Sequence, residues 1–177
     1  MSRVDDTLDK TEIEKYLRAL NNRLEKENII GEVVLFGGAV MCLVFDSREQ
    51  TKDIDAVYYP KEVINRIIHQ MATEYGLREN WFNDSVKGFL SGAPDLQKVK
   101  DYGNLIVYSP SAEYVFAMKC YACRILEEKS DIDDIKFLLK HLEVKDYDTA
   151  LQIIGKYYSM DRISVKTKYV LEQLIGE

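Results

Sequence analysis

The sequence has few of the residues that build disulfide frameworks or zinc sites. Its 177 residues include three Cys and two His. So small and odd a number of Cys argues against a set of disulfides and is typical of a reducing compartment. Cys120 and Cys123 form a Cys-x-x-Cys pair within a helical pattern. A structural zinc site needs four ligands, however, and the sequence offers neither a second pair nor a nearby His. We therefore expect buried thiols at this pair rather than a metal centre.

The chain also lacks a long hydrophobic segment and an excess of basic residues. Its longest apolar stretches, such as residues 39–45, are far shorter than the ~18 residues that span a membrane. The first residues lack the apolar core of a signal peptide. These absences predict a cytoplasmic protein that does not enter a membrane. With 24 Lys and Arg against 30 Asp and Glu, the formal net charge is −6. This charge disfavours non-specific binding to duplex nucleic acid, although it is compatible with a local basic groove.

What is present is a mixed pattern of strands and helices followed by a purely helical one. Short β-rich runs predict strands over residues 33–36, 54–59 and 104–108. Apolar residues at helical spacing predict helices over residues 11–24, 39–45, 61–75, 114–127, 130–142, 151–158 and 165–175. This order predicts an α+β fold. A small mixed sheet with flanking helices is expected in residues 1–108, and a helical bundle in residues 109–177, the two packed as one compact unit.

Two glycines and two aspartates stand at the ends of the first two predicted strands. Gly37 and Gly38 follow the first strand, and Asp53-Ile54-Asp55 begins after fourteen further residues. Because side chains alternate along a strand, we expect Asp53 and Asp55 to share one face, with Cα atoms ~6.7 Å apart. Two like charges at that distance repel by about 2.5 kcal/mol at an effective dielectric constant of about 20. A divalent ion such as Mg²⁺ or Mn²⁺ would offset this repulsion.

The glycine pair adds a place where a phosphate can approach the backbone closely. Together with metal-binding carboxylates, it predicts a site for metal-assisted nucleotidyl transfer. Each feature alone has an ordinary alternative, since an Asp-x-Asp is commonly a solvated surface pattern and a Gly-Gly is commonly a simple turn. The order strand, Gly-Gly, helix, polar loop and Asp-x-Asp strand favours the functional interpretation.

Five motifs carry a resemblance to a known family over about residues 30–142. They are Leu35-Phe36-Gly37-Gly38, Thr51-Lys52-Asp53-Ile54-Asp55-Ala56-Val57, Trp81-Phe82-Asn83-Asp84, Lys119-Cys120-Tyr121-Ala122-Cys123-Arg124 and Asp131-Ile132-Asp133-Asp134-Ile135. In this combination the chain resembles the DNA polymerase β-type nucleotidyltransferase superfamily. Within it, the chain is similar to the small bacterial nucleotidyltransferases of the AbiEii toxin type. The resemblance implies a nucleotidyltransferase fold and a role in a toxin–antitoxin or phage-defence system.

The resemblance also implies a role for each matched residue. Asp53 and Asp55 would hold Mg²⁺ and, with Lys119, make up the catalytic set. The nucleotide would be bound by the remaining matched residues, which are Gly37, Gly38, Thr51, Lys52, Asp84, Asp131 and Asp134. The implied reaction transfers a nucleotidyl group from an NTP to a hydroxyl of RNA, with tRNA as the family's usual acceptor, or to a hydroxyl of a protein.

The chain departs from the superfamily pattern at one acid. Many of these enzymes carry a third carboxylate on a later strand, and the predicted strand 104–108 contains none, which leaves Asp84 as a substitute. Lys119 has an alternative as well, because a helical Lys can extend to solvent instead of pairing with a phosphate or a carboxylate. Arg124 is expected to pair with Asp131 or Asp134.

The missing acid favours a second hypothesis, that of a non-catalytic nucleotide sensor or partner-binding protein of the same fold. A cognate protein partner would then bind the apolar stripe of the predicted helix 165–175, unless that stripe belongs to the core.

Overall fold

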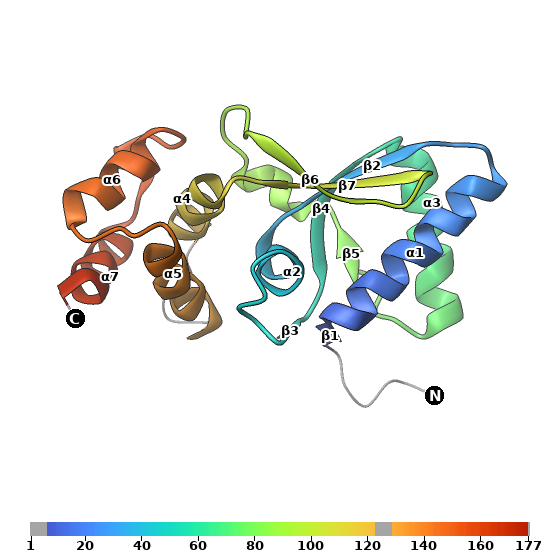
Figure 1. The fold of residues 1–177 in the computed structure, drawn as a ribbon, viewed down its shortest axis with the longest axis horizontal. Coiled ribbons are helices and arrows are strands. Elements are labelled where there is room, and N and C mark those ends of the chain that lie inside the picture. The colour runs from blue at the N-terminus through green and yellow to red at the C-terminus, as the bar shows by residue number, and fades with distance from the viewer. Residues whose placement is uncertain (1–6, 123–128, 177) are drawn as a thin grey trace. The chain divides into compact units, whose positions relative to one another are not determined.

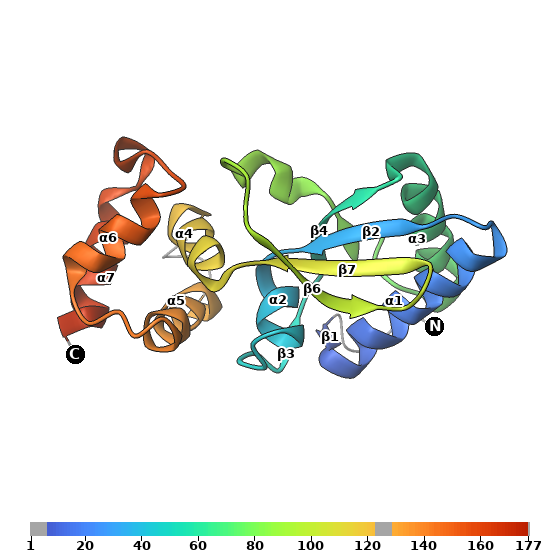
Figure 2. The same cartoon turned by 45° about the horizontal axis from the view of Figure 1, so that its top comes forward.

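The computed structural model describes residues 7–122 and 129–176. By its internal contacts the chain divides into two compact units. The first unit consists of Met1–Gly88 and Leu96–Ser109, and the second consists of Phe89–Asp95 and Pro110–Glu177. Figures 1 and 2 show the elements of both units in two orientations.

The first unit combines strands with helices. Its elements in chain order are β1 (Leu8–Asp9), α1 (Lys10–Lys26), β2 (Gly31–Leu35), α2 (Gly37–Leu43), β3 (Gln50–Thr51), β4 (Ile54–Tyr59), α3 (Lys61–Tyr75), β5 (Phe82–Asn83), the 3₁₀ turn η1 (Ser85–Phe89), β6 (Leu96–Asp101) and β7 (Leu105–Pro110). The last residues of η1 and β7 already belong to the second unit.

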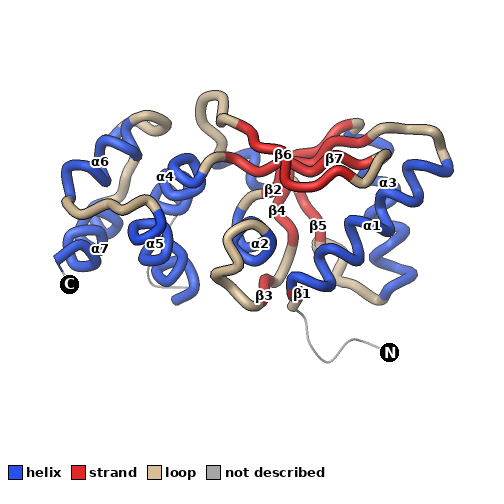
Figure 3. Tube along the Cα trace, viewed as in Figure 1, coloured by secondary structure: helices blue, strands red, loops and turns tan. Residues whose placement is uncertain are grey.

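Five of these strands form one mixed sheet in the order β5-β4-β2-β7-β6 (Figure 3). β2 runs antiparallel to β4 and parallel to β7, and β4 runs parallel to β5. The register places Leu35 opposite Ala56 and Val34 opposite Val57. β1 and β3 form a separate antiparallel pair.

Alternating burial gives the five-stranded sheet two different faces. In β4, Ile54, Ala56 and Tyr58 are buried, whereas Asp55 and Val57 are only partly buried. The helices α1, α2 and α3 lie on the buried side of the sheet (Figure 1). Asp55 therefore belongs to the other face of the sheet, which none of these three helices covers.

The second unit is helical. It contains α4 (Ala112–Ala122), α5 (Lys129–His141), α6 (Tyr147–Gly155), the 3₁₀ turn η2 (Met160–Arg162) and α7 (Val165–Gly176).

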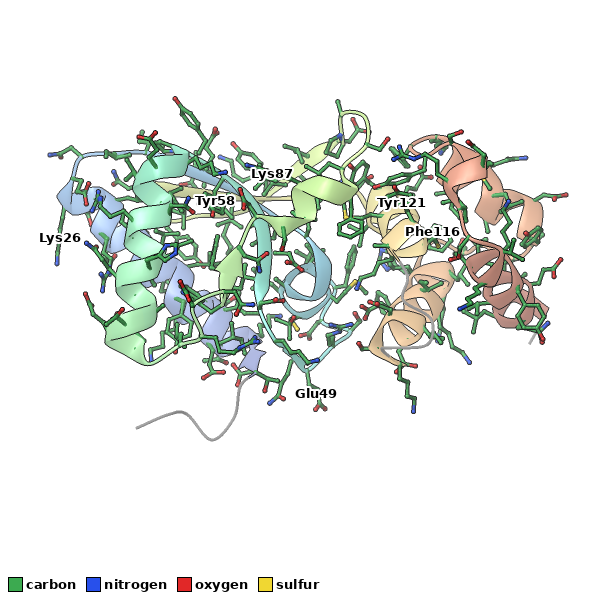
Figure 4. The ribbon with its side chains drawn as sticks, turned by 180° about the vertical axis from the view of Figure 1, so that it is seen from behind. Lys26, Glu49, Tyr58, Lys87, Phe116 and Tyr121 are labelled. Atoms are coloured by element: carbon green, nitrogen blue, oxygen red, sulfur yellow. The ribbon has the colours of Figure 1, made fainter. Side chains whose placement is uncertain are left out.

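Aromatic residues of the second unit bind the incoming segment Phe89–Asp95. The Tyr114 hydroxyl donates to the Ser91 carbonyl at 2.9 Å, and the Tyr158 hydroxyl donates to the Phe89 carbonyl at 2.5 Å. The ring of Tyr158 also stacks on Tyr121 of α4, with centroids 4.5 Å apart. Figure 4 labels Tyr121. These bonds explain why a segment from the middle of the chain belongs to the helical unit.

The predicted α+β class, with a small mixed sheet and a helical C-terminal part, is confirmed. The predicted strand 54–59 and helix 61–75 agree with β4 and α3, and Gly76 ends α3 in the left-handed conformation at φ 64°. Helix α1 begins one residue earlier than predicted, because Asp9 caps it. The Glu12 amide donates to Asp9 Oδ1 at 2.8 Å, and the Glu12 carboxylate accepts from the Asp9 amide at 3.2 Å.

Two further observations bear on membranes and partners. None of the helices that the structure describes is both long and apolar enough to cross a membrane. The apolar stripe predicted for the C-terminal helix consists of Val165, Tyr169, Val170, Leu174 and Ile175. Val165 and Tyr169 are exposed and the other three are partly buried, whereas α7 buries Thr167 and Leu171.

Candidate functional site

Gly37 lies where β2 passes into α2, against the carboxylate of Asp55. Its φ of +57° is in the left-handed region, which costs a residue with a side chain roughly 1–2 kcal/mol. The preceding Phe36 amide donates to the Asp55 carbonyl at 2.8 Å, which holds the turn against β4. A Cβ placed on Gly37 would lie 2.7 Å from Asp55 Oδ2. Both the conformation and the available space therefore require glycine here.

Gly38 is buried and lies against two polar side chains from the segment before β4. A Cβ on Gly38 would collide with the Thr51 hydroxyl and would lie 2.7 Å from Arg48 Nη1. No side chain fits between these groups unless one of them moves. The absence of a Cβ at residues 37 and 38 thus lets a carboxylate, a hydroxyl and a guanidinium surround one turn.

The segment from Thr51 to Asp53 connects this turn to β4. Thr51 is buried in β3, and its hydroxyl donates to the Asp53 carbonyl at 3.2 Å. The Lys52 side chain is exposed, while its carbonyl accepts a bond from the Arg78 guanidinium. Asp53 and Asp55 were expected to share one face through the alternation of side chains along a strand. β4 begins at Ile54, as predicted, so Asp53 lies in the bend just before it and is partly buried.

The structure therefore brings together Gly37, Gly38, Thr51 and Asp55, which are four of the predicted site residues. Sequence reasoning did not identify Arg48 as the fifth member of this group. The signal was weak, because Arg48 stands in a polar loop whose composition resembles any solvated connection.

Asp84 forms ion pairs that make it a poor substitute for the missing third carboxylate. It lies 2.9 Å from the amines of both Lys61 and Lys87 (Figure 4 labels Lys87). The hydrogen bond from Lys87, followed by that from Lys61, lowers the pKa of Asp84 from 3.8 to about 2. A carboxylate with so low a pKa has little tendency to take a proton from an attacking hydroxyl at neutral pH.

Changing Asp84 to Asn should remove part of the acid dependence of stability. Folding lowers the pKa of Asp84, so its contribution is complete above about pH 4 and is lost as the pH falls toward 2. Because the group is largely solvent-accessible, we expect a contribution of only ~0.2–1 kcal/mol. In urea unfolding, the difference between wild type and Asp84→Asn should shrink from pH 6 to pH 2. A constant difference over this range would contradict the assignment.

Lys119, Asp131 and Asp134 form a separate cluster in the second unit. The Lys119 amine lies 2.9 Å from Asp131 Oδ1 and 2.7 Å from Asp134 Oδ2. Only 11% of the Lys119 side chain and 5% of the Asp134 side chain are exposed. Lys119 thus pairs with carboxylates and does not extend to solvent. Cys120 is buried as expected, whereas Cys123 and Arg124 lie outside the described residues.

Apart from the exposed Lys52 and from Asp84, which pairs with Lys61 and Lys87, the predicted site residues fall into two groups. One lies around the Gly37–Gly38 turn of the first unit, and the other is the Lys119 cluster of the second. Among the described residues, no group of three or more His, Cys, Asp and Glu is placed to hold a metal ion. Asp53 and Asp55 are only two residues, so they do not make up a group of three. Mg²⁺ prefers oxygen ligands, and two carboxylates can hold it when phosphate oxygens and water supply the remaining ligands.

In comparisons with known proteins, the sequence matches no family model, no curated protein and no solved structure. The chemistry of the site itself therefore has to indicate the function.

Proposed function

We propose that the protein is a nucleotidyltransferase of the DNA polymerase β type. It would bind an NTP with Mg²⁺ at the Gly37–Gly38 turn and transfer a nucleotidyl group to a hydroxyl of RNA or of a protein. The observation that carries this proposal is the position of Asp55. Its Oδ2 lies 2.7 Å from where a Cβ of Gly37 would be, so a possible phosphate turn and a possible metal ligand are in contact.

The geometry supports this proposal better than either motif does alone. Fourteen residues separate Gly38 from Asp53 in the sequence, yet the β2–β4 ladder places Leu35 opposite Ala56 and so returns Asp55 to the turn. Thr51 is buried beside Gly38, where its hydroxyl could turn from the Asp53 carbonyl to donate its one proton to a phosphate oxygen. A solvated Asp-x-Asp would not need two glycines packed against its own segment.

The residues present suit a bound Mg²⁺ that Asp53 and Asp55 would hold. Such an ion would neutralise charge on the phosphate oxygens. In the reaction, a bond forms between the acceptor hydroxyl oxygen and the α-phosphorus. The bond between the α-phosphorus and its bridging oxygen breaks, pyrophosphate leaves, and the acceptor proton passes to solvent water. The role of the protein is to position these groups and to stabilise the charge of the leaving group.

A non-catalytic nucleotide sensor is the second candidate, and one observation favours it. β7, which lies beside β2, places Ile106 and Tyr108 on the face that carries Asp55, and the strand contains no acid. With Asp84 held by two lysines, neither it nor β7 supplies a base for the reaction. A sensor would bind the nucleotide at the same turn without transferring it.

Label transfer separates the two candidates. We expect wild-type protein to incorporate label from an α-³²P-labelled NTP into total RNA, or into protein, only when Mg²⁺ or Mn²⁺ is present. Asp53→Asn should reduce the incorporation by at least ~100-fold, because it removes a metal ligand and a charge from the site. Its circular dichroism spectrum should remain that of wild type. If Asp53→Asn transfers label at the wild-type rate, the proposed active site is wrong.

A further inference from the structure

The loop between α2 and β3 is anchored at both ends. After α2, the amides of Val44 and Phe45 donate to the Val40 carbonyl, and the Ser47 amide donates to the Met41 carbonyl at 3.0 Å. These bonds keep the loop alongside the helix. At its other end, Gln50 and Thr51 pair with β1. Arg48 therefore has a defined position between two fixed segments.

Within this loop, only one of two adjacent charged residues is directed at the glycine turn. Arg48 is partly buried, and its Nη1 atom lies 2.7 Å from the position of a Cβ on Gly38. Glu49 is exposed and lies at the outer end of the loop (Figure 4). The loop thus directs Arg48 toward Gly38, whereas its two acids, Asp46 and Glu49, are exposed to solvent.

This position suits a polyphosphate for electrostatic reasons. The carboxylates of Asp53 and Asp55 alone would repel the negative charges of a nucleotide. A divalent ion neutralises the two carboxylates but leaves the charge of the phosphates uncompensated. A guanidinium does not bind metal, but its planar fork binds phosphate oxygens with two parallel hydrogen bonds. Arg48 and Thr51 adjoin Gly38, whereas Asp55 adjoins Gly37. The turn therefore has a cationic side and a metal-binding side.

We propose that Arg48 contacts the phosphates that leave as pyrophosphate, and so makes the site prefer triphosphates over monophosphates. This inference rests on the proposed function, because it assigns one more residue to the same site. Arg48 stabilises the charge that develops on the bridging oxygen when the α–β bond breaks. No proton is transferred to or from Arg48 in this step.

The test measures binding of inorganic pyrophosphate, of each NTP and of the matching NMP, all with Mg²⁺, by isothermal titration calorimetry. Arg48→Gln should weaken binding of pyrophosphate and of the NTP by ~10–100-fold, the effect expected for a lost charge-assisted pair. It should change NMP binding by less than about threefold, since an NMP lacks the leaving phosphates. Arg66→Gln is the matched control, because Arg66 is an exposed arginine paired with Glu27 at 2.6 Å.

Two measurements exclude a merely structural effect of Arg48. Binding of Mn²⁺ alone, followed by electron paramagnetic resonance, should be equal in wild type and Arg48→Gln. Arg48→Lys keeps the charge without the planar fork, so it should bind pyrophosphate with intermediate affinity, and it also provides the test if Arg48→Gln does not fold.

The possible failures are distinguishable. If wild type binds NTP but the affinity is unchanged in Arg48→Gln, or in Arg48→Lys where that variant alone folds, the role of Arg48 is overturned and the proposed function stands. Equal weakening of NMP and pyrophosphate also overturns the role. If wild type binds neither pyrophosphate nor any NTP, the proposed function itself fails, and this inference fails with it.

Discussion

Replacing Lys119 with Met is expected to lower the free energy of unfolding by about 3–5 kcal/mol, the usual cost of breaking a buried ion pair. The Lys119 amine lies within 2.9 Å of two carboxylates, and the Asp134 side chain is only 5% exposed. Met has a similar length but no charge, so both carboxylates would lose their shared cation while they remain shielded from water. Chemical denaturation measures this loss directly.

Lys156→Met is the matched control for this prediction. Lys156 lies 2.7 Å from Glu113, but the two side chains are 53% and 37% exposed. Solvent screens such a pair, so its loss should cost no more than about 1 kcal/mol. Adding Asp131→Asn and Asp134→Asn to Lys119→Met should restore most of the lost stability. If Lys119→Met costs as little as Lys156→Met, the cluster is not the buried ion-pair network that its geometry indicates.

The Lys119 cluster also shows which features of the structure can be predicted from the sequence. A lysine among Phe116, Ala117, Met118 and Cys120 needs an anionic partner if it is buried. From the sequence alone, the Lys119 amine could contact a phosphate, a carboxylate or solvent. Spacing within α5 does place Asp131 and Asp134 on neighbouring turns of one helix face. Which cation they pair with depends on the packing of α4 on α5, which no local pattern reveals.

The strands likewise differ in whether the sequence predicts them. β2, β4 and β7 are predictable, because each contains a short run rich in β-branched and aromatic residues that turn residues bound. β6 was not predicted. Its residues Leu96–Asp101 form an edge strand in which every residue is at least partly exposed, so no alternation of apolar residues marks it. Its pairing with β7 is a tertiary effect that outweighs the local preference.

At the candidate site, the glycines and aspartates were predictable because their chemistry is unusual at strand ends. Their contact was not, because it depends on the register between β2 and β4. Arg48 was missed for a related reason. Its role depends on the path of a loop that returns along α2 through the Ser47–Met41 bond, and its sequence shows only polar residues.

Asp55→Asn is the second variant with a large expected effect. Asp55 is partly buried at the glycine turn, and Asn keeps its shape while removing the charge. A neutral amide is a much poorer ligand for Mg²⁺ than a carboxylate. We therefore expect affinity for the Mg²⁺–NTP complex to fall by at least ~100-fold. Glu32→Gln is the matched control, because Glu32 is an exposed acid on the neighbouring strand β2.

The most direct test of the central claim is thermal unfolding of wild type, Asp55→Asn and Glu32→Gln with each NTP, with and without Mg²⁺. A ligand at one hundredfold its Kd adds about 2.7 kcal/mol of stability, which corresponds to roughly 5–10 °C for a protein of this size. The predicted result is a rise of this size with at least one NTP in wild type and Glu32→Gln, dependent on Mg²⁺ and absent in Asp55→Asn. An unchanged midpoint with every NTP, or an equal rise in Asp55→Asn, would contradict the proposed nucleotide site.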